Sequence, residues 1–272
     1  MEVEEAKRRI AGVFGRSAAT YDRAGPSFFG HFGRRVAELA EIPAGACVLD
    51  VAAGAGASLV PAAELAGPNG HVVGVDLSPG MVRRLREEID ERGLVNGEAQ
   101  VMDATVLEFP DASFDRILCG WALFFFPEPE RVLERFRDLL RPGGRIVVST
   151  FEDEDEGWSW LDELLLEHGA AVRLAPEGAR RFDDADELRA ALEAAGFDDV
   201  GVRSEPHELV FGDEDEWWAW GWTHGFRAAL EAMDDARRER FRKRAFERLR
   251  SQAEPDGIHR TFRVLLATAR RR

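Results

Sequence analysis

The chain has 272 residues, and 45% of them are hydrophobic, which is enough for one large domain with a sizeable core. Its formal net charge of −15 at pH 7 would repel nucleic acid and anionic membranes, so neither is expected as a partner. No apolar run is long enough to span a bilayer, and the acidic start Met1–Glu5 lacks a signal-peptide core, so we expect a cytoplasmic protein.

Two amphipathic helices are predicted before the first strand, over residues 2–16 and 27–41. Together they would form an N-terminal helical cap of residues 1–41. In the second helix apolar residues recur at helical spacing: Phe28, Phe32, Val36 and Leu39. Tyr21, the single tyrosine of the chain, lies between the two helices.

A small-residue turn follows the first predicted strand, residues 46–51. Gly54 and Gly56 lack a Cβ, so the backbone can bend sharply and a ligand can lie directly on it. The helix that follows would present unpaired N–H groups at its start. A dinucleotide site would need a third glycine where the bulky Leu59 stands, which disfavours a nicotinamide-dependent oxidoreductase.

Strands and helices alternate after this turn, with strands over 71–75, 98–102, 114–119 and 144–150 and helices over 57–66, 79–92 and 128–141. This alternation predicts a doubly wound parallel sheet with ligands beyond the carboxyl ends of its strands. Asp50, Asp76, Asp103 and Cys119 would lie at that edge. Asp76 comes twenty residues after Gly56, where an acid accepts hydrogen bonds from ribose hydroxyls. A helix cap is the alternative for Asp76, and a plain turn residue for Asp103.

The order of these motifs resembles class I S-adenosylmethionine (SAM)-dependent methyltransferases, whose first turn reads D-x-G-x-G-x-G. Asp50, Gly54 and Gly56 match that pattern, while Ala52 replaces its first glycine. The resemblance extends over residues 45–150 and implies a Rossmann-like α/β fold. The sheet would have seven strands, with the last strand antiparallel at one side.

The resemblance also implies SAM as cofactor. The glycine turn would lie against its methionine end, Asp103 and Ala104 would face the adenine, and Tyr21 would close over the sulfonium. The full cofactor-binding set is then Asp50, Gly54, Gly56, Asp76, Leu77, Asp103, Ala104 and Cys119.

Residues 120–127 follow the fourth strand, where the related enzymes meet the methyl acceptor. This segment lacks the Asn/Asp-Pro-Pro-aromatic tetrad that holds a planar nitrogen, and it lacks the acid that binds the divalent metal of catechol-type enzymes, so no metal is expected. Trp121 and Phe125 are the candidates for the wall of an acceptor pocket.

The rest of the chain divides into the end of the core with an added helix (151–205), a helical lid insertion (206–258) and the last strand of the sheet (259–272). Strands are predicted at 198–204 and 261–269. Four tryptophans fall within 217–222 on one predicted helix, which would carry two faces. The first face would be buried and comprises Trp218, Trp222, Phe226, Ala229 and Met233. The second would line a cavity or an oligomer interface and comprises Trp217, Trp220, His224, Arg227 and Glu231.

These patterns predict a SAM-dependent methyltransferase that acts on a small aromatic or heteroaromatic metabolite by O- or N-methylation. His224 would act as base or orienting group, because histidine titrates near neutral pH, and Tyr21 is the second catalytic candidate. Substrate contacts are expected from Trp121, Phe125, Trp217, Trp220 and Arg227. The alternatives are C-methylation of an electron-rich carbon, a SAM-binding protein that does not methylate, and a non-catalytic interaction module. A homodimer is also possible.

Overall fold

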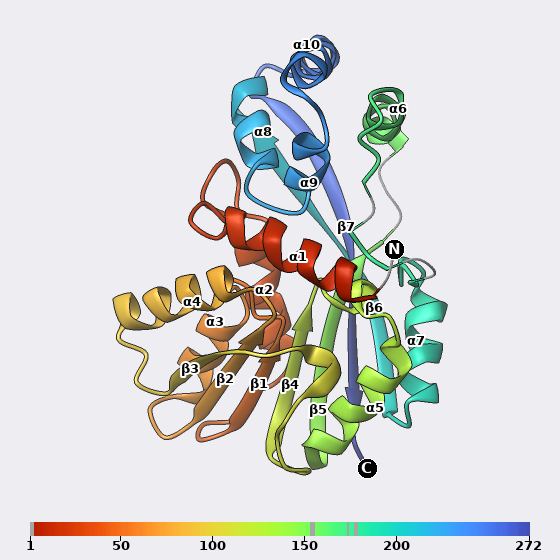
Figure 1. The fold of residues 1–272 in the computed structure, drawn as a ribbon. Helices are drawn as coiled ribbons and strands as arrows, with labels where there is room; N and C mark the ends of the chain where they lie inside the picture. Colours follow the sequence, from red (N-terminus) through yellow and green to blue (C-terminus); the bar gives the residue numbers. More distant parts are fainter. Residues whose placement is uncertain (1–2, 153–155, 173, 177–178) are drawn as a thin grey trace.

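The computed structural model describes residues 3–152, 156–172, 174–176 and 179–272. They fold around a seven-stranded sheet of order β3-β2-β1-β4-β5-β7-β6 (Figure 1). The strands are β1 (Cys47–Val51), β2 (His71–Asp76), β3 (Gly97–Val101), β4 (Phe114–Gly120), β5 (Leu140–Phe151), β6 (Asp198–Phe211) and β7 (Ile258–Arg270). The first five strands are mutually parallel, whereas β7 runs antiparallel to both β5 and β6.

The predicted Rossmann-like sheet with an antiparallel last strand is confirmed, with one correction to its order. β7 lies inside the sheet, between β5 and β6, and not at one side. It pairs with β5 from Arg145↔Arg270 to Phe151↔Val264 and uses its other edge for β6. β6 therefore forms the edge of the sheet.

Helices cover both faces of the sheet. On one face lie α2 (Phe29–Leu39), α3 (Leu59–Ala66) and α4 (Pro79–Arg92), and on the other α5 (Pro129–Leu139) and α7 (Ala185–Ala194) (Figure 1). Strand residues alternate between the two layers, so that Val48 packs in the first and Leu49 in the second. Because both faces are buried there, β1 and β2 are mostly apolar and mostly buried, the pattern that predicted them.

The N-terminal helix α1 (Val3–Ser17) crosses above the sheet (Figure 1). It rests on α4 where two glycines meet, and a Cβ on Gly80 would lie only 2.8 Å from the Gly15 Cα. The absence of both side chains lets the two helices approach closely, which brings α1 over the carboxyl ends of the strands.

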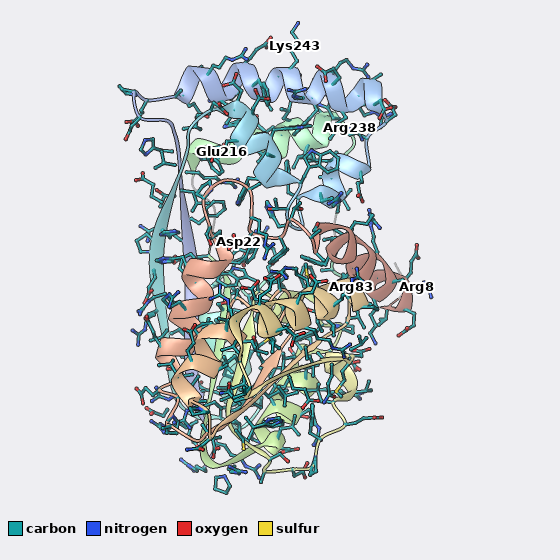
Figure 2. The ribbon with its side chains drawn as sticks, turned by 90° about the vertical axis from the view of Figure 1, so that its left-hand side faces the viewer. Arg8, Asp22, Arg83, Glu216, Arg238 and Lys243 are labelled. Atoms are coloured by element: carbon teal, nitrogen blue, oxygen red, sulfur yellow. The ribbon has the colours of Figure 1, made fainter. Side chains whose placement is uncertain are left out.

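β6 and β7 are longer than predicted and together form a ribbon that rises beyond the sheet (Figure 1). Their pairing continues to Phe211↔Ile258, so residues 206–211, which were expected in the helical lid, belong to a strand. The ribbon carries α8 (Glu214–Gly221), α9 (Arg227–Glu231) and α10 (Asp235–Gln252), and α6 (Ser159–Glu167) packs beside them. α10 runs along the top of this lid, with Lys243 pointing away from the molecule (Figure 2).

The single helix predicted over the tryptophan cluster is interrupted between Gly221 and Arg227. A Cβ on Gly221 would lie 2.7 Å from the Phe226 ring, so the chain folds back on itself at this point. The predicted buried face was partly wrong, because Trp217 and Trp220 of α8 pack into the hydrophobic core. Trp217 and Trp220 are 1% and 5% exposed, whereas Trp218 and Trp222 are only partly buried.

Among the described residues, no helix combines the length and the apolar character that crossing a membrane requires.

Candidate functional site

A cavity of about 500 Å³ opens where the strand order reverses, between β1 and β4. Sheets of this kind bind ligands at such a switch point. α1 covers the cavity, the carboxyl ends of β1, β2 and β4 form its floor, and the segment 222–226 between α8 and α9 closes one side.

The floor begins with the turn after β1, where the backbone takes positive φ angles. Ala52, Gly54 and Gly56 have φ of 56°, 55° and 97°. An alanine in this left-handed region costs about 1–2 kcal/mol, which gives a physical reason for the glycine that the resemblance expects at position 52. α2 lies directly on the turn because Gly33 has no side chain, and a Cβ there would be 2.3 Å from the Ala57 carbonyl oxygen. Gly54 lines the cavity, whereas Gly56 faces a separate surface groove.

Asp76 joins the end of β2 to this turn. Its carboxylate accepts hydrogen bonds from the Gly54 N–H at 2.9 Å and from the Ser78 N–H at 2.8 Å. Burial raises the pKa of Asp76, and these two hydrogen bonds offset part of that shift. Asp76 and Leu77 both line the cavity.

Asp50 lies beneath the turn and outside the cavity lining. It is 1% exposed, its Oδ2 has no hydrogen-bond partner among the described residues, and the backbone of Leu59 at the start of α3 partly stabilises its charged form. Burial raises the pKa of Asp50 well above its usual range, and the nearby charge of Asp76 adds to the shift. This position lets Asp50 support the turn and α3 from below.

Asp103 and Ala104 line the cavity beyond the end of β3. Lys7 of α1 reaches Asp103, with 2.7 Å between Nζ and Oδ2, and also donates to the Thr105 hydroxyl at 3.2 Å. Burial alone would raise the pKa of Asp103, but the hydrogen bonds from Lys7 and Thr105 hold it below its ordinary value. Sequence reasoning missed Lys7, although it is one of only two lysines in the chain.

At the end of β4 the cavity is lined by Gly120 and Trp121. Cys119 is fully buried among side chains on the α5 side of the sheet, and burial raises the pKa of its thiol. Trp121 takes a φ of 50°, an outlier for a bulky residue, and strain of this kind concentrates at functional sites. Its backbone N–H donates to the Ser149 carbonyl, and its ring packs edge-on against Phe28.

The part of the cavity away from the acids is aromatic. Its walls come from α1, α2, the loop after β4, β5 and the lid, and comprise Phe14, Phe29, Phe124, Phe125, Phe126, Phe151 and Phe226. The predicted Trp121 and Phe125 lie among them, while most of the other rings were not predicted as site residues. Rings from segments so distant in the chain carry no shared sequence signal.

Tyr21 also lines the cavity and stacks on Phe29, with ring centroids 4.9 Å apart. Its position depends on Asp22, which has a φ of 53°. The Asp22 carboxylate caps the start of α2, accepting from the Phe28 N–H at 3.0 Å and the Gly30 N–H at 2.7 Å. Sequence reasoning missed Asp22, although an aspartate shortly before a helix is a common cap.

His224 lines the aromatic end of the cavity from the segment between α8 and α9. Its Nδ1 lies 3.0 Å from the Trp220 carbonyl oxygen. A carbonyl oxygen only accepts, so Nδ1 carries the proton and Nε2 keeps a free lone pair. Burial, together with the nearby charge of Arg260, lowers the pKa of His224 to about 4, although the bond to Trp220 works against that shift. The imidazole is therefore neutral at pH 7 and a weaker base than a histidine with an ordinary pKa.

Three of the predicted substrate contacts lie outside this cavity. Trp217 and Trp220 line a second, smaller cavity on the other side of His224. The Arg227 guanidinium lies over the Trp222 ring at 5.4 Å and bonds Glu231 and the Arg16 carbonyl. Arg227 thus ties α9 to α1.

Known proteins resemble the chain along most of its length. Residues 48–144 match the family model of a methyltransferase domain. The chain is 37% identical to aklanonic acid methyltransferase DauC of Streptomyces sp. (strain C5), over 72% of this chain and 95% of that protein. It is 33% identical to nocamycin O-methyltransferase of Saccharothrix syringae, over 96% of this chain and 98% of that protein. The crystal structure of YcgJ from Bacillus subtilis has the same fold, with a TM-score of 0.61 at 21% identity, and covers 89% of this chain and 99% of that one.

Proposed function

The chain belongs to the class I SAM-dependent methyltransferases, and we propose that it transfers the methyl group to an oxygen atom of a small aromatic metabolite. One observation carries this proposal: a single cavity has acids and a glycine turn at one end and aromatic rings around a neutral histidine at the other. The names of two relatives agree with it, because one acts on aklanonic acid and the other is an O-methyltransferase.

SAM is the cofactor of this enzyme class, and bound SAM supplies an activated methyl group on a positively charged sulfur. The residues that line the cavity are compatible with bound SAM. Asp76 has a carboxylate at the end of β2 for the ribose hydroxyls, and Asp103 and Ala104 lie where the adenine is expected. Gly54 leaves room for the methionine portion, and Tyr21 covers it from the side of α2.

The acceptor then lies among the rings, in contact with His224. Methyl transfer needs the attacking atom in line with the methyl group at about 3–3.5 Å, and the close-packed aromatic walls restrict the acceptor to few orientations. They also exclude water, which would otherwise solvate the nucleophile.

The low pKa of His224 narrows the choice of acceptor group. A base with a pKa of about 4 takes a proton effectively only from an acidic group, such as an acidic enol or an acidified phenol, whereas a carboxylic acid is already ionised at pH 7 and needs no base. Its free Nε2 would accept a hydrogen bond from such a group and orient the oxygen. A weakly acidic amine or alcohol would gain little from this histidine.

The position of the methyl group tests the proposal. We would incubate the protein with SAM carrying a ¹³C-labelled methyl group and a panel of small aromatic acids, enols and phenols, and assign the labelled carbon in the products by NMR. A signal on oxygen is expected. A signal on an acceptor carbon would establish the C-methylation alternative, and bound SAM without transfer to any acceptor would favour a non-methylating role.

His224→Ala tests the histidine. We expect kcat to fall about 100-fold or more, which is the usual contribution of acid–base catalysis, while the dissociation constant of SAM stays unchanged. In the parent enzyme kcat should also fall as the pH drops through the pKa of about 4, because a protonated imidazole cannot accept a proton. Unchanged turnover in the variant would remove His224 from the mechanism.

A further inference from the structure

The second cavity, of about 200 Å³, lies between α6, α8 and the start of β7. It shares four lining residues with the first cavity: Phe29, Phe151, His224 and Phe226. The two spaces are therefore separated only by side chains, three aromatic rings and an imidazole. Side-chain rotations of this kind are common when a ligand binds.

The lining of this second space is mostly apolar and comes from the lid. Leu161 and Leu165 of α6 face Trp217 and Trp220 of α8, and Phe262 of β7 adds a further ring. These elements have no part in the expected SAM contacts. The second cavity is thus available to a ligand while the cofactor occupies its own end of the first.

Arg260 places a positive charge at this apolar space. The residue is only 9% exposed, and its guanidinium lies over two rings, 4.6 Å from the centre of Trp158 and 4.3 Å from that of Phe262. Such cation–π contacts hold the planar group in place. Arginine carries five N–H donors, so the guanidinium can bind a ligand oxygen in addition to its contacts within the protein. The other charged residues of the lining do not share this burial: Asp162 and Arg263 are exposed, and Glu152 is half-buried and bonds Ser204.

The influence of Arg260 reaches His224, since its charge contributes to the lowered pKa of the imidazole. Both groups line the second cavity, so one molecule that extends past the imidazole can contact both of them.

We propose that the second cavity is a subsite for the distal part of the methyl acceptor, which is a fused aromatic system bearing an anionic oxygen group that Arg260 binds. This inference rests on the proposed function. The reacting oxygen lies in the first cavity beside SAM, the ring system passes His224, and the anionic group ends at the guanidinium. The preferred acceptors are then aromatic acids of more than one ring.

A binding experiment tests the subsite without depending on methyl transfer. The probes are 2-naphthoate and its neutral isostere 2-naphthamide, titrated calorimetrically into the protein saturated with S-adenosylhomocysteine. We expect the carboxylate to bind about tenfold more tightly than the amide. Equal affinities would overturn the inference.

Two variants assign that preference to Arg260. Arg260→Met keeps the length of the side chain and should weaken 2-naphthoate about tenfold while changing 2-naphthamide less than threefold. Arg263→Met, at an exposed position of the same cavity, is the matched control and should change neither. A similar loss for both probes in Arg260→Met would contradict a charge-specific contact.

Substitutions that fill each cavity in turn show where the probe binds. They also test the subsite if Arg260→Met does not fold. Leu165→Phe fills the second cavity and should abolish 2-naphthoate binding, whereas Val172→Phe fills part of the first and should leave it intact. The opposite pattern would overturn the subsite. If Leu165→Phe still methylates a one-ring acceptor, the proposed function holds independently of the subsite.

Discussion

The two ends of the main cavity are built from different parts of the chain. The end that we assign to the cofactor, called here the cofactor end, is formed largely by residues 52–105, through a backbone turn and carboxylates at the strand ends. The acceptor end combines rings from α1, α2, the loop after β4, β5 and the lid. The first is fixed by backbone geometry and hydrogen bonds, and the second by the packing of side chains from distant segments. Substitutions should therefore separate cofactor binding from acceptor binding.

The largest effect is expected from Asp76→Ala. Hydrogen bonds to a charged group contribute about 1.5–3 kcal/mol each, so SAM affinity should fall roughly 10- to 100-fold or more. Calorimetric titration with SAM measures this loss. Asp76→Asn, which keeps an oxygen for the Gly54 N–H, should lose less.

The matched substitution at the other end is Phe124→Leu, which should leave the SAM dissociation constant unchanged. If Asp76→Ala bound SAM as tightly as the parent protein, the assignment of the acid end to the cofactor would be wrong.

Gly33→Ala tests whether backbone contact fixes the cofactor end. The new Cβ would lie 2.3 Å from the Ala57 carbonyl oxygen, so α2 must move away from the glycine turn. Overpacking of this kind costs about 1–3 kcal/mol, which urea unfolding would measure. Weaker SAM binding should accompany the loss.

Gly12→Ala is the control, because among the described residues only the Arg16 Nη1, at 3.2 Å, would lie within 4 Å of the new Cβ. It should stabilise α1 by up to about 1 kcal/mol, the helix propensity of alanine over glycine. A neutral Gly33→Ala variant would mean that α2 does not hold the turn.

Lys7→Met tests whether α1 helps to hold the cofactor end. The Lys7–Asp103 pair is partly buried, with side chains 20% and 23% exposed, and pairs near the surface contribute up to about 1 kcal/mol. SAM affinity should therefore fall less than about tenfold, and the difference should shrink at high salt. Arg8→Met is the control, since Arg8 lies on the outer side of α1 (Figure 2). An equal effect of both substitutions would attribute the loss to the net charge of α1 and not to the pair.

The smallest effect is expected from Ala52→Gly. Relief of the left-handed strain, about 1–2 kcal/mol, exceeds the entropic cost of a new glycine, about 0.5–1 kcal/mol, so stability should rise by up to about 1 kcal/mol. A thermal melt would show a small increase in Tm. Ala55→Gly, at a position of the same turn without a positive φ, should lower the Tm instead. A lower Tm for Ala52→Gly would show that the methyl group at position 52 contributes more to stability than the backbone strain costs.

The difference between local backbone patterns and the packing of distant segments also explains which features could be predicted from the sequence. The strands, the glycine turn and the acids after β2 and β3 follow from local patterns, because strand ends, turns and caps are set by neighbouring residues. The break at Gly221 was not predicted, because it depends on the Phe226 ring folding back onto the glycine. The length of β6 was underestimated, because its pairing with β7 continues to Phe211 and strand pairing is decided by the partner strand.

The sequence by itself determined the Rossmann-like core, the SAM-dependent class and the place of the acids at the ends of β2 and β3, since each is encoded within a few neighbouring residues. Only the tertiary structure decided that Asp50 lies beneath the turn, that Trp217 and Arg227 stand away from the main cavity, and that His224 is half-buried with a lowered pKa. Burial and the pKa depend on which distant segments surround a side chain, and periodicity along one helix does not contain that information.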